Sequence, residues 1–173
     1  MKNVILIGMP GCGKSTVGVV LAKILGYRFV DSDIVIQEQE KRLLSEIIEQ
    51  EGLERFNEIE NRVNSQLEVE KTVVATGGSV VYGKDAMAHL KEIGTVVYIR
   101  LPYEEIEERL GDFAARGVSI RKEQTLRELY EERVPLYEKY ADLIIDEQRL
   151  TVSKTAIAIA RQLQHDPKRR YTI

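Results

Sequence analysis

Residues 4–24 constrain the fold of this chain more than any other part of its sequence. They open with the apolar run 4–7, which has the length of a buried strand. Residues 8–15 then read Gly-Met-Pro-Gly-Cys-Gly-Lys-Ser and match the pattern G-x-x-x-x-G-K-S at every position. Apolar residues follow at helical spacing, at Val17, Val20, Leu21 and Ile24. A strand, a glycine loop and a helix in this order indicate a phosphate-binding loop, because a chance glycine turn rarely has both flanks.

The residue types of this loop fit the chemistry of a nucleoside triphosphate. Glycines allow backbone N–H groups to turn inward and to form an anion-binding nest at a helix N-terminus. Lys14 can reach the β- and γ-phosphates as a point charge, and the Ser15 hydroxyl can ligate Mg²⁺. We therefore predict that a nucleotide is bound by Gly11, Cys12, Gly13, Lys14, Ser15 and Thr16.

The composition predicts one compact domain, residues 1–173, since this length suits a single core. A net charge of −3 provides no basic field for a nucleic acid, and no apolar run is as long as a membrane span. A strand begins almost at the N-terminus, so no signal or transit peptide is expected and we predict a cytoplasmic protein. We expect a monomer, because no long apolar stripe is left over.

Cys12 is the only cysteine, which excludes an intramolecular disulfide and fits a reducing compartment. Two interpretations of this side chain are open. The helix dipole could lower the pKa of the thiol, or the residue could be a small filler under the loop.

Strand-like runs alternate with helical patterns along the whole chain. The strand candidates are residues 4–7, 28–30, 72–75, 96–99 and 143–145. Residues 44–70 have a helical pattern that Gly52 interrupts, followed by an apolar stripe that we interpret as core packing: Leu53, Phe56, Ile59, Val63 and Leu67. This alternation predicts an α/β fold with a parallel sheet covered on both faces.

Residues 111–124 show neither period, and Thr125 with Glu128 forms a capping box for the next helix. This glycine-flanked segment carries Arg116 and Arg121 and can be a lid over the phosphates or an ordinary surface loop. Residues 166–173 are polar and basic after a proline and are expected to be a loose tail.

The second predicted strand ends in Asp31-Ser32-Asp33. In an extended segment both carboxylates project to one face, at the strand end where open α/β sheets bind ligands. One can hold Mg²⁺ and the other can accept a hydrogen bond from a hydroxyl nucleophile. The alternative, that Asp33 only caps the following helix, is less favoured beside a phosphate-binding loop.

Two further motifs are weaker by themselves. Gly77-Gly78 follows the third predicted strand, where paired glycines allow close backbone approach to a ligand or form a plain turn. Arg133 lies two residues before Pro135, which must break or kink an otherwise helical pattern. A guanidinium held at such an irregularity can clamp a carboxylate, although a surface arginine is the simpler explanation.

Taken together, the motifs resemble the shikimate kinase family. The phosphate loop, the Asp31–Asp33 pair, the run Ala75-Thr76-Gly77-Gly78 and Arg133-Val134-Pro135-Leu136-Tyr137 occur in that family's order, and the resemblance covers essentially the whole chain. It implies a three-layer α/β/α P-loop fold with five parallel strands in the order 2-3-1-4-5. It also implies a helical substrate-binding region at residues 32–70 and a lid at 111–124.

By this resemblance the chain transfers a phosphoryl group from Mg·ATP to the 3-hydroxyl of shikimate, with a small molecule as its partner. Lys14, Asp33 and Arg116 would be catalytic, and Arg109 would approach the adenine. Asp33, Asn57, Gly77, Gly78 and Arg133 would bind the acceptor, with Arg133 on its carboxylate. Ser15 and Asp31 would hold Mg²⁺.

Three positions depart from the family pattern. Asn57 stands where members of the family carry an arginine, while the acidic residue of that motif is kept as Glu60. Ser79 replaces a third glycine, and Gly117 follows Arg116 in place of proline. Losing one of two carboxylate-clamping arginines should weaken affinity roughly tenfold or more.

Four hypotheses follow from these observations. The acceptor is shikimate, or it is a less anionic hydroxylated metabolite on which Asn57 forms a neutral hydrogen bond. A nucleotide-binding module without catalysis is disfavoured by the complete set Lys14, Ser15, Asp31, Asp33 and Arg116. A nucleoside-monophosphate kinase would need more arginines facing the acceptor phosphate.

Overall fold

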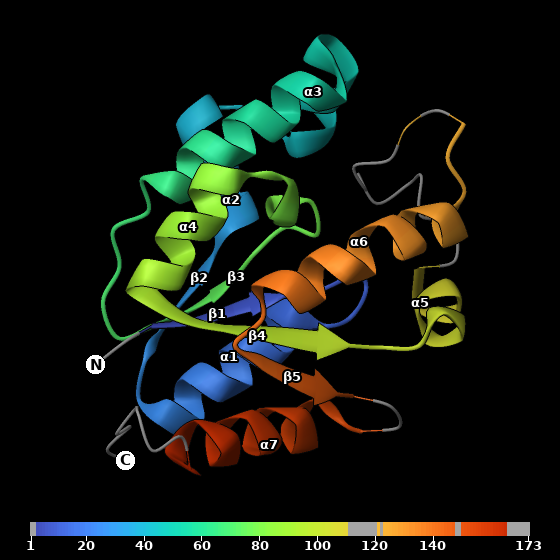
Figure 1. The fold of residues 1–173 in the computed structure, drawn as a ribbon. Coiled ribbons are helices and arrows are strands. Elements are labelled where there is room, and N and C mark those ends of the chain that lie inside the picture. Colours follow the sequence, from blue (N-terminus) through green and yellow to red (C-terminus); the bar gives the residue numbers. More distant parts are fainter. Residues whose placement is uncertain (1–2, 111–120, 122, 148–149, 166–173) are drawn as a thin grey trace.

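A computed structural model of the chain describes residues 3–110, 121, 123–147 and 150–165 (Figure 1). One sheet of five parallel strands lies at its centre, in the order β2-β3-β1-β4-β5. The strands are β1 (Asn3–Ile7), β2 (Arg28–Asp31), β3 (Thr72–Ala75), β4 (Gly94–Arg100) and β5 (Leu143–Asp146). All five predicted strands and their order are confirmed.

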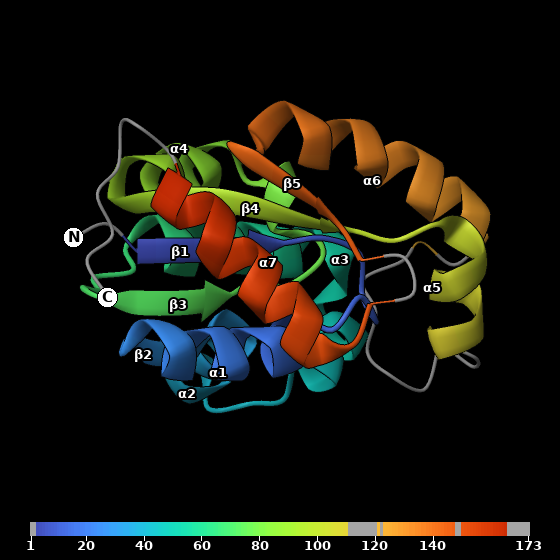
Figure 2. The ribbon, with the colours of Figure 1, turned by 90° about the horizontal axis from the view of Figure 1, so that it is seen from below.

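Helices cover both faces of the sheet, as predicted. They are α1 (Lys14–Leu25), α2 (Ser32–Glu40), α3 (Leu44–Ser65), α4 (Lys84–Ile93), α5 (Tyr103–Leu110), α6 (Leu126–Tyr140) and α7 (Val152–His165), with a 3₁₀ turn η1 at Val80–Tyr82. Figures 1 and 2 show α1 and α7 on one face and α4 and α6 on the other. Because both faces are covered, the central strands β1 and β4 are almost entirely buried and apolar.

The helical region after β2 has a small core of its own. Ile36 of α2 packs with four residues of α3, namely Ile47, Phe56, Ile59 and Val63. This cluster and the main core confirm core packing for Phe56, Ile59, Val63 and Leu67, whereas Leu53 is only half-buried and belongs to neither cluster. The small core fixes α3 against α2 beyond the sheet, where the side chains of α3 can reach a ligand.

Helix α3 is shorter than its sequence pattern indicates. It ends at Ser65, although the apolar spacing continues to Leu67. Leu67 lies beyond the end of the helix and packs in the main core, so the expected helical pattern over 44–70 is wrong in its last residues. Gly52 has φ 83° and ψ 171°, so the predicted interruption of the helix is confirmed as a kink.

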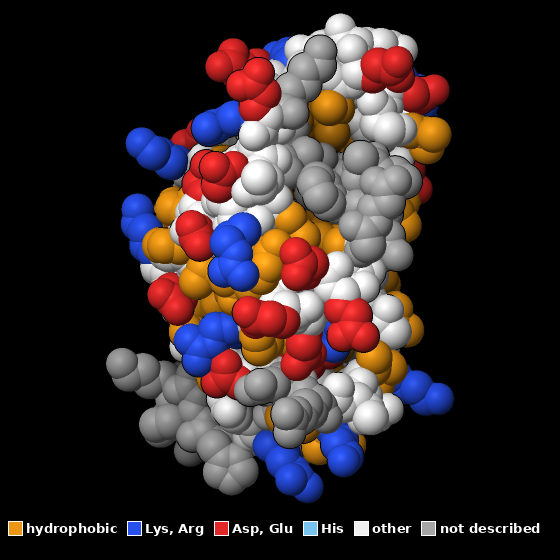
Figure 3. Space-filling model, turned by 90° about the vertical axis from the view of Figure 1, so that its right-hand side faces the viewer, with side chains coloured by type: hydrophobic (Ala, Val, Ile, Leu, Met, Phe, Trp, Pro, Cys, Tyr) orange, Lys and Arg blue, Asp and Glu red, His pale blue; other side chains and the backbone are white. Residues whose placement is uncertain are grey.

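Since all five strands are parallel, their carboxyl ends meet at one edge of the sheet. The view from this side shows acidic and basic side chains intermixed, without a large field of one sign (Figure 3). Over the described part of the chain, no helix combines the length and apolar character needed to cross a bilayer.

Candidate active site

The glycine loop joins β1 to α1 and adopts a backbone that glycine makes possible. Gly11 and Gly13 have φ of 79° and 86°, in the left-handed region. A Cβ on Gly8 would lie 2.7 Å from the Ile99 carbonyl oxygen on β4. The loop is therefore held tightly against the sheet and leads directly into the N-terminus of α1, where phosphate binds favourably.

Lys14 begins α1 and turns back over the loop. Its Nζ donates hydrogen bonds to the carbonyl oxygens of Gly8 (2.8 Å) and Met9 (3.0 Å), and only 8% of the residue is exposed. These two bonds hold the ammonium against the glycine loop.

Cys12 fills the space beneath this loop. Its side chain is fully buried, and burial raises the pKa of the thiol despite the nearby Lys14 ammonium. The interpretation in which the helix dipole lowers the pKa of this thiol is therefore wrong. The filler interpretation holds, because desolvation outweighs the positive charge.

Ser15 and Asp31 form a hydrogen-bonded pair of oxygen-bearing side chains beside the loop. The Ser15 hydroxyl donates to Asp31 Oδ2 at 2.7 Å, while Asp31 Oδ1 accepts from the backbone N–H of Asp33 at 3.0 Å. Among the described residues, no three His, Cys, Asp or Glu side chains are arranged so that they could hold a metal ion by themselves. Two hard oxygen donors suit Mg²⁺, which takes its remaining ligands from phosphates and water.

The structure corrects the reason why both aspartates lie here. Helix α2 begins at Ser32, so Asp33 belongs to the first helical turn and not to an extended strand. Asp31 is the N-cap of α2 and satisfies the helix end. The Asp33 carboxylate is consequently available to the cavity, and the interpretation of Asp33 as a mere cap is wrong.

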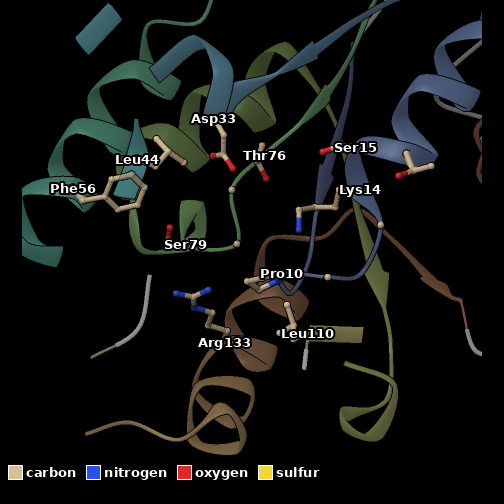
Figure 4. Close-up of a pocket in the computed structure, with 15 residues that line it drawn as sticks. Pro10, Lys14, Ser15, Asp33, Leu44, Phe56, Thr76, Ser79, Leu110 and Arg133 are labelled. Carbon is tan, nitrogen blue, oxygen red and sulfur yellow. The ribbon is translucent and has the colours of Figure 1, made fainter. Parts of the chain in front are cut away.

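A cavity of about 380 Å³ connects these groups at the carboxyl edge of the sheet (Figure 4). Asp33 and Thr76 point in from one side, Arg133 from the opposite side, and Lys14 from a third side. The lining residues are Pro10, Gly11, Gly13, Lys14, Ser15, Thr16, Asp33, Leu44, Phe56, Thr76, Gly77, Gly78, Ser79, Leu110 and Arg133.

Gly77 and Gly78 are required by close packing around this cavity. A Cβ on Gly77 would clash with Glu60 Oε1 and lie 2.8 Å from Asp33 Oδ1. A Cβ on Gly78 would lie 2.7 Å from Pro10 and 3.0 Å from Arg133 Nη1. This packing brings two carboxylates and a guanidinium around the glycine turn, while the predicted approach of the turn to a ligand stays a prediction.

Asp33 and Glu60 are the two carboxyl groups beside Gly77. Burial, followed by the charge of Asp31, raises the pKa of Asp33 to about 6. Burial raises the pKa of Glu60 to about 7, although a hydrogen bond from Ser79 opposes this shift. Asp33 Oδ1 and Glu60 Oε1 are buried without a hydrogen-bond partner in the described structure, so both can take a donor from a ligand.

Glu60 is absent from the sequence-based set of site residues, although a signal for it exists. It lies on the apolar side of α3, four residues after Phe56 and three before Val63. An acidic residue on such a face is either paired or functional. Ser79, one of the departures from the family pattern, is buried beside it.

Arg133 and Tyr137 are one turn apart on α6 and both face the glycine turn. Tyr137 donates a hydrogen bond to the Gly78 carbonyl oxygen at 2.6 Å. Arg133 is 1% exposed and its Nε donates to the Tyr82 hydroxyl at 3.3 Å. The interpretation of Arg133 as a surface arginine is therefore wrong, and its guanidinium lies at the end of the cavity opposite Asp33.

Pro135 does not break α6, which runs from Leu126 to Tyr140. The proline removes the hydrogen bond to the Glu131 carbonyl. Both Pro135 and Glu131 are exposed, so water can replace that bond.

Among the predicted site residues that the structure describes, four do not line the 380 Å³ cavity: Cys12, Asp31, Asn57 and Arg109. Asn57 lines an adjacent cavity of about 340 Å³ on the far side of Arg133. Arg109 lies beside Gly11 and pairs with Glu105 (3.5 Å) and Glu147 (3.6 Å). Arg116, and with it most of the predicted lid, lies outside the described residues, as does the tail at 166–173.

Comparison with known proteins agrees with this geometry. The family model described as shikimate kinase matches residues 10–164. A shikimate kinase from Thermodesulfovibrio yellowstonii is 38% identical over 167 residues, covering 95% of this chain and 96% of the relative.

Solved structures give the same result. The shikimate kinase from Acinetobacter baumannii in complex with shikimate has a TM-score of 0.88 and 32% identity, covering 96% of this chain and 95% of that one. The shikimate kinase from Aquifex aeolicus has a TM-score of 0.80 and 31% identity, with 94% and 96% covered. A fold, a site and relatives of nearly equal length thus lead to one assignment: the chain belongs to the shikimate kinase family.

Proposed function

We propose that this protein transfers the γ-phosphoryl group of ATP to a hydroxyl of shikimate. The observation that carries the proposal is the convergence of a phosphate loop, a buried carboxylate and a buried guanidinium on one cavity. Shikimate has hydroxyls for the carboxylate and a carboxylate for the guanidinium. The relatives that are named shikimate kinase support this choice of acceptor.

The mechanism follows from where the side chains lie. Asp33, with its unpartnered oxygen, accepts a hydrogen bond from the attacking hydroxyl and takes its proton. Lys14 and the loop N–H groups neutralise charge on the transferring group, and Arg133 fixes the other end of the acceptor. Mg²⁺, held by Ser15 and Asp31, would supply further charge neutralisation on the β- and γ-phosphates. Arg116 is proposed to contact the phosphates and Arg109 the adenine.

The test is ADP release from Mg·ATP with and without saturating shikimate, together with direct detection of phosphorylated shikimate. Wild-type protein should show shikimate-dependent turnover, and Lys14→Met should abolish it while the fold is retained. Nucleotide binding without any shikimate-dependent product would contradict the proposed acceptor.

A second candidate acceptor is supported by Asn57. Its Oδ1 is buried without a hydrogen-bond partner among the described residues, and it can accept from a neutral hydroxyl or amide. A less anionic polyol would then replace shikimate in the same reaction. Turnover of such a polyol at a higher kcat/KM than shikimate would favour this candidate.

A further inference from the structure

A second cavity, next to Arg133, is lined by three charged side chains that the proposed reaction does not use: Glu54, Arg121 and Glu132. It lies between α3 and α6 and shares Arg133 with the first cavity. Its volume is about 340 Å³. The lining residues are Leu53, Glu54, Asn57, Tyr82, Arg121, Gln124, Leu129, Glu132 and Arg133.

Asn57 leaves this cavity without the cation that the family pattern places at its position. Arg55 and Arg62, the neighbouring arginines of α3, do not replace it. Arg55 pairs with Glu51 and Glu58, and Arg62 pairs with Glu40. Neither arginine lines either of the two cavities.

Arg121 is the cation that the structure puts there instead. Among the described residues that line the two cavities, the cations are Lys14, Arg121 and Arg133. Lys14 is committed to the phosphate loop, where it bonds the carbonyl oxygens of Gly8 and Met9. Arg121 and Arg133 therefore line the same cavity. Arg121 comes from the chain just before α6, whereas the arginine of the family pattern would come from α3.

Arg121 is held loosely in its present position. Its Nη1 lies 3.9 Å from Glu132 Oε2, and 75% of its side chain is exposed. Glu132 has other partners, since it accepts hydrogen bonds from the Tyr82 hydroxyl and from Gln124 Nε2 (2.9 Å). An exposed pair of this kind contributes little, so Arg121 can turn toward an anion in the cavity at small cost.

We propose that Arg121 is a specificity-determining residue that supplies, with Arg133, the second guanidinium for the acceptor carboxylate. The inference rests on the proposed function, because it names how this chain binds an anionic acceptor without an arginine at position 57. Glu54 and Glu132 line the same cavity and oppose an anion there. Binding therefore depends on both guanidinium groups.

The experiment compares Arg121→Ala with wild type in steady-state kinetics on shikimate and on its methyl ester, which lacks the negative charge. We expect the KM for shikimate to rise about tenfold to a hundredfold, the range for one charge-assisted hydrogen bond. The kcat and the KM for ATP should stay close to wild type. Kinetics on the ester should not respond to the substitution.

Matched variants separate a role in binding from a general disturbance. Arg127→Ala is the control, because Arg127 stacks on the Tyr103 ring at 4.0 Å and lines neither cavity. Asn57→Arg in the Arg121→Ala background should recover most of the shikimate affinity. Arg121→Lys should recover part of it, since an ammonium keeps the charge but not the two-pronged contact.

An unchanged KM for shikimate in Arg121→Ala, with active wild type, would overturn the inference and leave the proposed function intact. If wild type shows no turnover, the inference is tested by measuring shikimate binding to wild type and to Arg121→Ala by calorimetry. Weaker binding to Arg121→Ala supports the inference although the proposed reaction fails. Equal binding, or no binding to either protein, refutes it.

Discussion

Asp33 is the residue on which the chemistry of the proposed reaction depends. Its carboxylate faces the cavity because Asp31 satisfies the start of α2. Asp33→Asn should lower kcat by about 10²- to 10⁴-fold, the usual contribution of a positioned base, with the KM for ATP little changed. Because the pKa of Asp33 is about 6, the wild-type kcat/KM for shikimate should fall as the pH drops below 6. A large loss of ATP affinity in Asp33→Asn would instead assign this residue to the metal site.

Glu60 predicts a dependence of stability on pH. The folded state raises the pKa of this carboxyl from 4.5 to about 7, so its contribution to stability is complete below pH 4.5. It declines as the pH rises through 7, because the unfolded chain ionises more readily than the folded one. The loss amounts to about 3 kcal/mol at most.

Glu60→Gln should therefore flatten the profile of unfolding free energy between pH 5 and 8, measured by urea denaturation without ligand. Glu58→Gln is the control, since Glu58 is on the same helix and its side chain is 66% exposed. A Glu60→Gln profile with the slope of wild type would show that Glu60 is not the group that titrates.

At the scale of elements, α6 connects Arg133 to the Gly77-Gly78 turn. Tyr137 stacks on Tyr98 of β4 with ring centroids 5.1 Å apart, and its hydroxyl bonds the Gly78 carbonyl. Arg133 on the same helix face is positioned by the same packing. The helix thus fixes the spacing between the Gly77-Gly78 turn and the guanidinium.

Tyr137→Phe should remove that connection with little change in volume. The half-buried Gly78 carbonyl would lose its donor, which costs about 1 kcal/mol of stability. The KM for the acceptor should rise while the KM for ATP stays constant, because Gly78 lines the acceptor side of the cavity. Tyr140→Phe, on the same helix but outside both cavities, is the control. If Tyr137→Phe and Tyr140→Phe had the same KM for the acceptor, the hydrogen bond to Gly78 would have no role in acceptor binding.

At the scale of the whole molecule, nucleotide binding should stabilise the fold, because the loop joins β1 and α1 of the main core. A non-hydrolysable ATP analogue with Mg²⁺ at 100 times its Kd should add about 2.7 kcal/mol. This corresponds to a rise in Tm of about 5–10 °C for a domain of this size. Lys14→Met should lose most of the shift, and removing Mg²⁺ with EDTA should reduce it in wild type. An equal shift in Lys14→Met would place the nucleotide elsewhere.

The sequence by itself determined the fold and the nucleotide end of the site. Apolar runs, glycines and helical periods are local signals, and the carboxyl ends of parallel strands must meet at one edge. Lys14, Ser15, Asp31 and Asp33 were therefore predictable from their positions after β1 and β2. The predictions of a monomer, of a cytoplasmic location and of the role of Arg116 stay predictions.

Only the tertiary structure showed which residues gather at the end of the site proposed to bind the acceptor. Glu60 contacts Ser79, and Arg121 lines the same cavity as Asn57; these pairs are 19 and 64 positions apart in the chain. Such contacts depend on how α3 and α6 pack across the carboxyl edge of the sheet, and no local pattern records that packing. The same holds for Pro135, which α6 accommodates because that side of the helix faces solvent.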